Sequence, residues 1–149
     1  MGNNSHRLQP AVQVAHRSED SAAQALADSQ RRLTEQQRRL QQLLEFRREY
    51  SDQLQSNGRG GITALRLQTY MAFLAKLDHS IAQCRQSLES FRKEFQRKRH
   101  LWLQSHAKTQ ALEGLIQRDH QKQEQVENRR EQADSDERNL RRDRQFGED

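Results

Sequence analysis

Hydrophobic residues recur with a heptad spacing on both sides of a glycine-rich stretch at residues 56–61. Downstream of this stretch, two interleaved sets of positions give the alternating 3–4 spacing of a coiled-coil face. No proline interrupts residues 62–149, so the pattern predicts one long helix over residues 62–142. The two sets are Leu67, Leu74, Ile81, Leu88, Phe95, Trp102, Thr109 and Ile116, and Tyr70, Leu77, Cys84, Phe91, Lys98, Ser105 and Leu112.

A less regular stripe precedes the glycines and predicts a first helix over residues 11–55. Residues 1–10 and 143–149 are expected to be disordered. The stripe begins at Val12, Ala15 and Glu19 and continues as Leu26, Leu33, Leu40, Arg47 and Leu54, with Ala22, Ser29, Gln36, Leu43 and Tyr50 in the alternate positions.

The two stripes are expected to pair with each other. A chain that turns near residues 58–59 brings together positions whose numbers add up to about 117. That register places Glu19 opposite Lys98, as a charge pair, and Arg47 opposite Tyr70, where a cation–π contact is favourable. A parallel homodimer is the alternative arrangement.

The fold class predicted is therefore all-α, a two-helix antiparallel coiled-coil hairpin with a longer second helix. Residues 56–61 form the turn, residues 62–106 pair with the first helix, and residues 107–142 overhang it. The seam is expected to contain Leu26, Leu33, Leu40, Leu43, Leu74, Ile81, Leu88, Phe91, Phe95 and Trp102.

Composition supports long helices over a compact core. Hydrophobic residues make up 32% of the 149 residues, against roughly 45–50% in ordinary globular chains. Disordered chains are usually rich in proline, but Pro10 is the single proline here. The one cysteine, Cys84, excludes an internal disulfide, and no secretory signal or membrane-spanning run is visible, so a cytoplasmic location is expected.

The glycines suggest a turn and not a phosphate site. A phosphate-binding loop follows a strand and usually carries a Lys-Ser or Lys-Thr pair, and neither feature is present. Asn57 and Gly58 are expected to supply left-handed backbone, and Thr63 to cap the second helix.

Candidate chemistry is otherwise sparse. The six histidines form no pair spaced four residues apart on one helical face, and no set of nucleophile, base and acid stands out. We therefore expect no catalysis, no metal site and no cofactor. The basic run at residues 94–100 could contact nucleic acid, although Phe95 and Lys98 belong to the seam and leave few cations facing outward.

Near the turn, both helices carry more apolar residues than the seam positions account for. Met71 and Phe73 lie outside it, and Leu44 and Phe46 widen the same end of the first helix. A surplus of this kind indicates either a broader local core or a docking surface, and docking is favoured because a two-helix tip has no third element to cover it.

The residues around the turn resemble the FliJ family of flagellar export proteins. The resemblance rests on "FRREYSDQL", "GRGGI" and "YMAFLAKLDHSIAQCRQSL", followed by "KRHLWLQSHAKTQALEGLIQR", in family order and spacing over about residues 46–120. It implies a component of the flagellar type III export apparatus that resembles the central stalk of rotary ATPases and has no active site.

The resemblance also implies partners. The export ATPase ring, the cytoplasmic part of the export gate and export chaperones are expected, with no nucleic acid and only peripheral contact with the inner membrane. On the gate side the residues are Tyr70, Met71, Phe73 and Leu77, and on the ATPase side they are Leu112, Leu115 and Ile116. A basic nucleic-acid-binding coiled coil and a structural homodimer are the alternatives.

Overall fold

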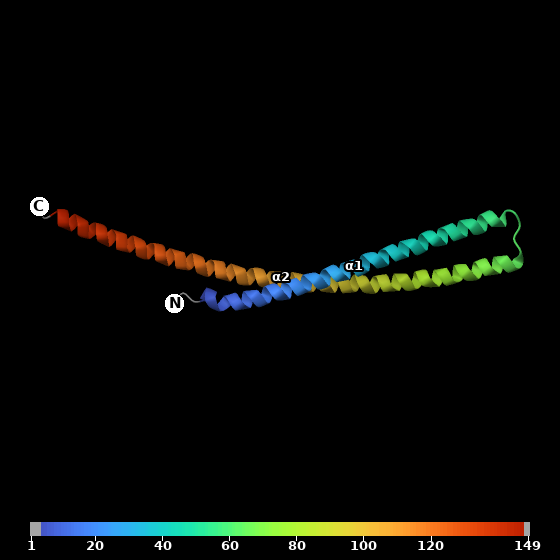
Figure 1. Cartoon of the computed structure of the whole chain (residues 1–149), viewed down its shortest axis with the longest axis horizontal. Helices are drawn as coiled ribbons and strands as arrows, with labels where there is room; N and C mark the ends of the chain where they lie inside the picture. The colour runs from blue at the N-terminus through green and yellow to red at the C-terminus, as the bar shows by residue number, and fades with distance from the viewer. Residues whose placement is uncertain (1–3, 148–149) are drawn as a thin grey trace. The chain divides into compact units, whose positions relative to one another are not determined.

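The computed structural model describes residues 4–147. They form two helices, α1 (Asn4–Gly58) and α2 (Ala64–Phe146), joined by a short turn, and no strand occurs among these residues (Figure 1). This confirms the predicted all-α hairpin with a longer second helix. Helix α1 extends beyond the predicted residues 11–55 at both ends, whereas α2 begins two residues later than predicted and ends at Phe146 instead of residue 142. Residues 4–10 and 143–146, which were expected to be disordered, are therefore helical. Residues 1–3 and 148–149 of the expected disordered ends lie outside the described residues.

The chain divides into two structural units, which are described separately. The turn unit is Ser21–Leu103 and contains the turn together with the adjoining halves of both helices. The terminal unit combines Met1–Asp20 with Gln104–Asp149. Each unit is therefore built from one part of α1 and one part of α2.

In the turn unit, α1 and α2 run antiparallel. Gln36 Nε2 lies 3.4 Å from the sulfur of Cys84, and Asn57 Nδ2 donates to the hydroxyl of Tyr70 at 3.2 Å. A residue with a higher number on α1 therefore contacts a residue with a lower number on α2, as antiparallel helices require. The buried residues lie on the heptad stripe, and they are Ser29 on α1 and Leu77, Ile81, Cys84 and Leu88 on α2.

The remaining stripe positions of the turn unit are mostly half-buried, as the edges of a two-helix seam should be. Leu67 is an exception, because it lies in the first turn of α2 opposite the end of α1 and stays exposed. The half-buried positions include Leu26, Leu33, Leu40, Leu43, Leu74, Phe91, Phe95 and Trp102.

The register differs from the predicted one by about one heptad. Arg47 was expected opposite Tyr70, but it forms an ion pair with Asp78, eight residues further along α2. Glu19 was expected opposite Lys98, but its carboxylate contacts His106, again eight residues further along. A seam with a seven-residue repeat presents the same stripe after a shift of seven, so the stripe was predicted correctly and its alignment was not.

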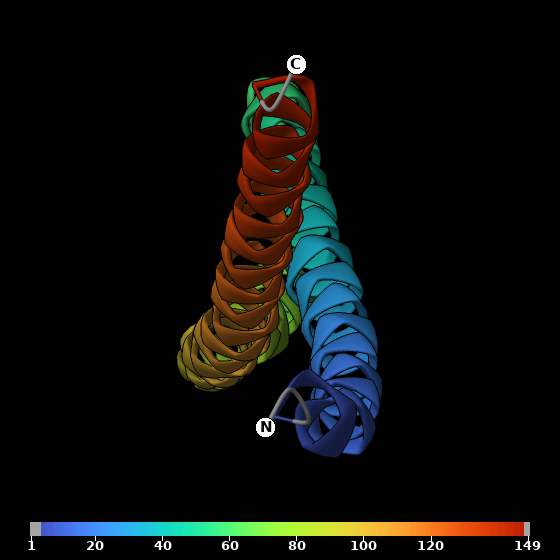
Figure 2. The ribbon, with the colours of Figure 1, turned by 90° about the vertical axis from the view of Figure 1, so that its left-hand side faces the viewer.

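In the terminal unit, α2 remains paired as far as Asp119. The backbone N–H of Ser5 donates to Asp119 Oδ2 at 2.9 Å, and His16 Nε2 lies 2.6 Å from Glu113 Oε1. The first part of α1 accordingly lies beside α2 (Figure 2). Residues 107–119 are thus paired, and not part of an overhang as expected, because α1 begins seven residues earlier than predicted and the register is shifted by about one heptad.

The turn depends on a different glycine from the one expected. Gly61 has a φ of 87°, and no other described residue has a positive φ, so neither Asn57 nor Gly58 supplies left-handed backbone. Gly61 N–H donates to the carbonyl of Gly58 at 3.3 Å and closes the end of α1. Thr63 caps α2 as predicted, because its hydroxyl accepts from the N–H of Arg66 at 3.2 Å.

Truncating a buried seam residue should destabilise the hairpin. Ile81 is 5% exposed, and Ile81→Ala is expected to cost about 2–5 kcal/mol, since it removes buried methyl groups and leaves a cavity. Leu103→Ala is the control, because Leu103 is 46% exposed and its loss should cost less than about 0.5 kcal/mol. Urea denaturation followed by circular dichroism measures both, and equal losses would contradict the assigned seam.

The contact between Glu19 and His106 should make stability depend on pH. The hydrogen bond with His106 lowers the pKa of Glu19, against a smaller opposing effect of burial. Ionised Glu19 therefore stabilises the folded state above the ordinary glutamate pKa of about 4.3, and this contribution is lost as the pH falls through the lowered pKa. Glu19→Gln should reduce the Tm at pH 7, and variant and wild type should converge in acid.

Glu124→Gln is the matched control, because Glu124 is exposed and forms no ion pair within residues 4–147. Its Tm should follow that of the wild type across the whole pH range. If the Tm of Glu19→Gln stays equally far below that of the wild type at a pH where Glu19 is protonated, the charge of Glu19 is not the source of the stabilisation.

Candidate partner-binding surfaces

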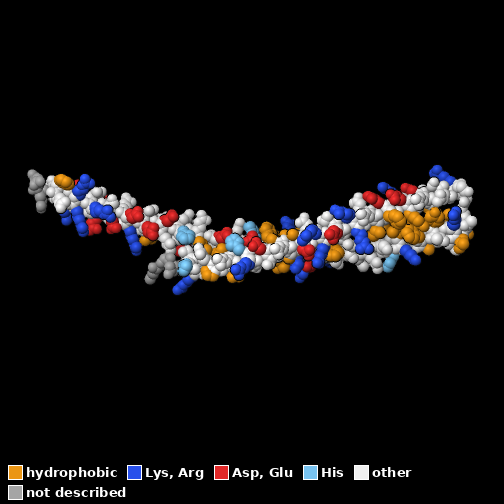
Figure 3. Space-filling view, in the orientation of Figure 1, with side chains coloured by type: hydrophobic (Ala, Val, Ile, Leu, Met, Phe, Trp, Pro, Cys, Tyr) orange, Lys and Arg blue, Asp and Glu red, His pale blue; other side chains and the backbone are white. Residues whose placement is uncertain are grey.

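Four aromatic side chains meet near the turn and form what we call the aromatic cluster. Phe46 and Tyr50 come from α1, and Tyr70 and Phe73 from α2. The ring centroids of Tyr50 and Phe73 are 4.6 Å apart, and those of Tyr50 and Tyr70 are 5.1 Å apart. Phe46 packs edge-on against Phe73 at 6.1 Å. Hydrophobic side chains gather over both helices at this end of the turn unit (Figure 3).

The gate-side residues predicted from the sequence differ in their exposure. Leu77 is only 7% exposed, because it lies in the seam between the helices. Tyr70 is half-buried, whereas Phe73 is 38% and Met71 is 55% exposed. Phe73 and Met71 can therefore touch a partner directly, while Leu77 supports the surface from beneath.

Two residues of the aromatic cluster were not singled out as partner-binding from the sequence. Tyr50 was assigned to the seam, and Phe46 was noted only as widening the first helix. The signal was present, because Phe46 lies directly before the seam position Arg47 and therefore borders the stripe. Phe46 is 48% exposed and extends the surface of Phe73 onto α1.

A cross-helix ion pair lies next to the aromatic cluster. Arg47 pairs with Asp78 through two contacts, the longer of which joins Nη2 to Oδ2 at 3.3 Å. The hydrogen bond with Arg47 lowers the pKa of Asp78, and the same bond raises the pKa of Arg47. Burial among the rings raises the pKa of Tyr50, so its hydroxyl stays neutral. The pair of Arg47 with Asp78 and the ring contacts of Tyr50 thus join the two helices in this part of the turn unit.

The ATPase-side residues predicted from the sequence lie in the terminal unit, and most of their surface is covered. Leu112 borders a shallow groove with Val14 of α1, and Ile116 borders another with Val12. Both side chains are half-buried, so the expectation that they lie unpaired is wrong. Leu115 borders the stripe between Leu112 and Ile116 and is 46% exposed.

Beyond the paired region, α2 continues as an exposed helix. Every described residue from 124 onward is exposed. Val126, Ala133 and Leu140 keep the seven-residue spacing of the seam although no part of α1 is available to cover them. This part of α2 is accordingly a helix with an apolar stripe and no described partner.

The basic run at residues 94–100 is partly neutralised within its own helix. Glu94 contacts Arg97 at 2.9 Å and Lys98 at 3.7 Å. The hydrogen bond with Arg97 lowers the pKa of Glu94 and keeps it ionised. These pairings leave a mixed surface and not the unbroken cationic stripe that is typical of a nucleic-acid site.

Metal-binding clusters and membrane-spanning helices are absent from residues 4–147. No group of three or more His, Cys, Asp or Glu side chains there is placed to hold a metal ion. None of the described helical segments combines the length and the apolar character needed to cross a membrane.

Comparisons with known proteins identify the family. The family model described as flagellar FliJ protein matches residues 4–146. The flagellar FliJ protein of Escherichia coli (strain K12) is 27% identical over 124 residues, which cover 83% of this chain and 84% of that protein. No solved structure matches the chain. Since the family match extends over nearly the whole two-helix hairpin, the chain belongs to the flagellar FliJ protein family.

Proposed function

We propose that this protein is the stalk and coupling component of flagellar type III protein export. Membership of the FliJ family supports a role in flagellar export. In this proposal the hairpin contacts three partners, which are the export ATPase ring, the cytoplasmic part of the export gate and export chaperones. It works in the cytoplasm and reaches the inner membrane only through the gate, as a peripheral component.

The observation that carries the proposal is the exposed aromatic cluster beside the turn. A two-helix seam needs only one stripe, yet Phe46, Met71 and Phe73 keep much of their apolar surface in water. Exposed apolar patches on soluble proteins commonly serve as interaction sites. Aromatic side chains are also enriched among the residues that contribute most to binding. We assign the gate contact to this surface, with Tyr70 and Leu77 as its supporting residues.

The ATPase contact is proposed for the terminal unit. Leu115 is the most exposed of the three residues expected there, and the unpaired stripe through Val126 and Leu140 adds apolar surface along the same helix. Leu112 and Ile116 hold this part of α2 against α1 and expose only their edges. The hairpin would then act without an active site of its own, by biasing the ATPase subunits that grip it.

Shortening Phe73 should separate binding from folding. Phe73→Ala is expected to weaken binding to the cytoplasmic part of the gate about tenfold or more, because it removes a half-exposed ring from the centre of the aromatic cluster. Isothermal titration calorimetry measures the affinity, and swimming motility measures the consequence. Helicity by circular dichroism should stay close to that of the wild type, because the ring lies outside the seam.

Leu101→Ala is the control for this experiment, because Leu101 is 44% exposed in the same unit but is not part of the aromatic cluster. It should leave gate affinity unchanged. Unchanged affinity of Phe73→Ala, or loss of helicity in that variant, would refute the assignment of Phe73 to the gate surface.

A charge at Leu115 should affect the ATPase contact alone. Leu115→Asp is expected to reduce co-purification with the export ATPase by at least about tenfold, since a carboxylate is poorly tolerated in an apolar interface. Gln110→Asp is the matched control, because Gln110 is exposed on the same helix, lies about 140° around α2 from Leu115 and borders neither groove. Equal behaviour of the two variants would argue against an ATPase contact at Leu115.

A further inference from the structure

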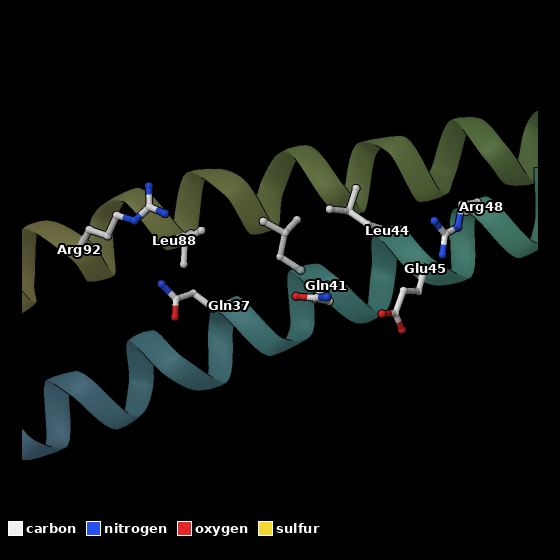
Figure 4. A pocket seen from close by; sticks show the side chains of 8 residues that line it. Gln37, Gln41, Leu44, Glu45, Arg48, Leu88 and Arg92 are labelled. Carbon is white, nitrogen blue, oxygen red and sulfur yellow. The ribbon is translucent and has the colours of Figure 1, made fainter.

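A second apolar surface of the turn unit is a groove that none of the proposed contacts uses. Leu40 and Leu44 of α1 and Leu88 of α2 form its floor, over a volume of about 580 Å³. Arg48 lies at one end and Arg92 at the other, and Glu45 lies beside Arg48 (Figure 4). We call this the leucine groove.

The leucine groove and the aromatic cluster lie on opposite sides of the seam. Successive residues of an α-helix are rotated by about 100° around its axis. Leu44 and Phe46, two residues apart, therefore lie on nearly opposite sides of α1. Leu44 is 39% exposed on the groove side, and Phe46 is exposed on the cluster side. A partner bound at the aromatic cluster therefore leaves the leucine groove open.

The two arginines at the ends of the leucine groove have no acidic partner among the described residues. No ion pair or side-chain hydrogen bond within residues 4–147 involves Arg48 or Arg92. In the turn unit Arg31, Arg32, Arg47 and Arg97 form ion pairs, and Arg48 and Arg92 are among the arginines that form none. The groove thus combines an apolar floor with two cations that lack a counter-charge, while Glu45 is the one acid that lines it.

We propose that the leucine groove binds an amphipathic helix of a partner protein. This helix carries leucine or isoleucine on one face and glutamate or aspartate at both ends of that face. Its apolar side chains cover Leu44 and the exposed edge of Leu40, above the buried Leu88, and its carboxylates pair with Arg48 and Arg92. An apolar helix face laid into a groove between two helices is a recurring recognition mode, and it completes a three-helix bundle. The proposal does not depend on the export role.

A charge-swap titration tests the proposal. The acidic probe is a synthetic helical peptide of about 18 residues, or five turns, with leucines on one face and glutamates at both ends of it. In the basic probe, lysines replace the glutamates. Fluorescence anisotropy with the full chain should give micromolar binding of the acidic probe and at least about tenfold weaker binding of the basic probe. The double variant Arg48→Glu/Arg92→Glu should reverse this preference.

Two further variants locate the binding site. Leu44→Asp should weaken the acidic probe by at least about tenfold, and Phe73→Ala should not, because Phe73 lies on the other side of the seam. Both side chains are exposed, so circular dichroism should report unchanged helicity. No binding of the acidic probe up to millimolar concentration, or binding that ignores Leu44→Asp and the charge swap, would overturn the proposal. A wild-type dimer that Leu44→Asp dissociates in sedimentation would overturn it as well, by assigning the groove to a second copy of the chain.

Discussion

Burial of one narrow apolar stripe between two helices is the constraint on which the rest of this protein depends. Hydrophobic residues are too few for an ordinary core, so in the turn unit burial is concentrated on one face of α2, at Leu77, Ile81, Cys84 and Leu88. A seam between two helices covers little more than the heptad positions of each. Apolar side chains outside it stay in contact with water, and those are the side chains available for partners.

Polar contacts across the seam fix the register of the two helices, which the apolar stripe alone does not specify. Leucines repeated every seven residues pack almost equally well after a shift of one heptad. Specific cross-helix pairs do not survive such a shift, because Arg47 would leave Asp78 and Glu19 would leave His106. Individually such partly exposed pairs contribute little to stability, but together they distinguish one register from its neighbours.

The turn unit presents two different surfaces for two different kinds of contact. The aromatic cluster is a partly exposed patch of rings from both helices, close in sequence to the buried Leu77 and to the pair of Arg47 with Asp78. The leucine groove is a depression with unpaired arginines at its ends. Because the two lie on opposite sides of one seam, a hairpin this slender can hold two partners at once without competition between them.

The heptad pattern by itself determined the two helices and the stripe that each of them buries, because these follow from the spacing of apolar residues and the scarcity of proline. The pattern favoured an antiparallel hairpin without excluding a parallel homodimer, and contacts such as that of Arg47 with Asp78 decided between them. The heptad pattern also predicted that the apolar residues Met71 and Phe73 lie outside the seam, and the structure leaves both exposed. The register, the early start of α1 and the coverage of Leu112 and Ile116 were decided only by the tertiary structure. These features depend on contacts between residues far apart in the chain, such as that of Ser5 with Asp119, which no local spacing encodes.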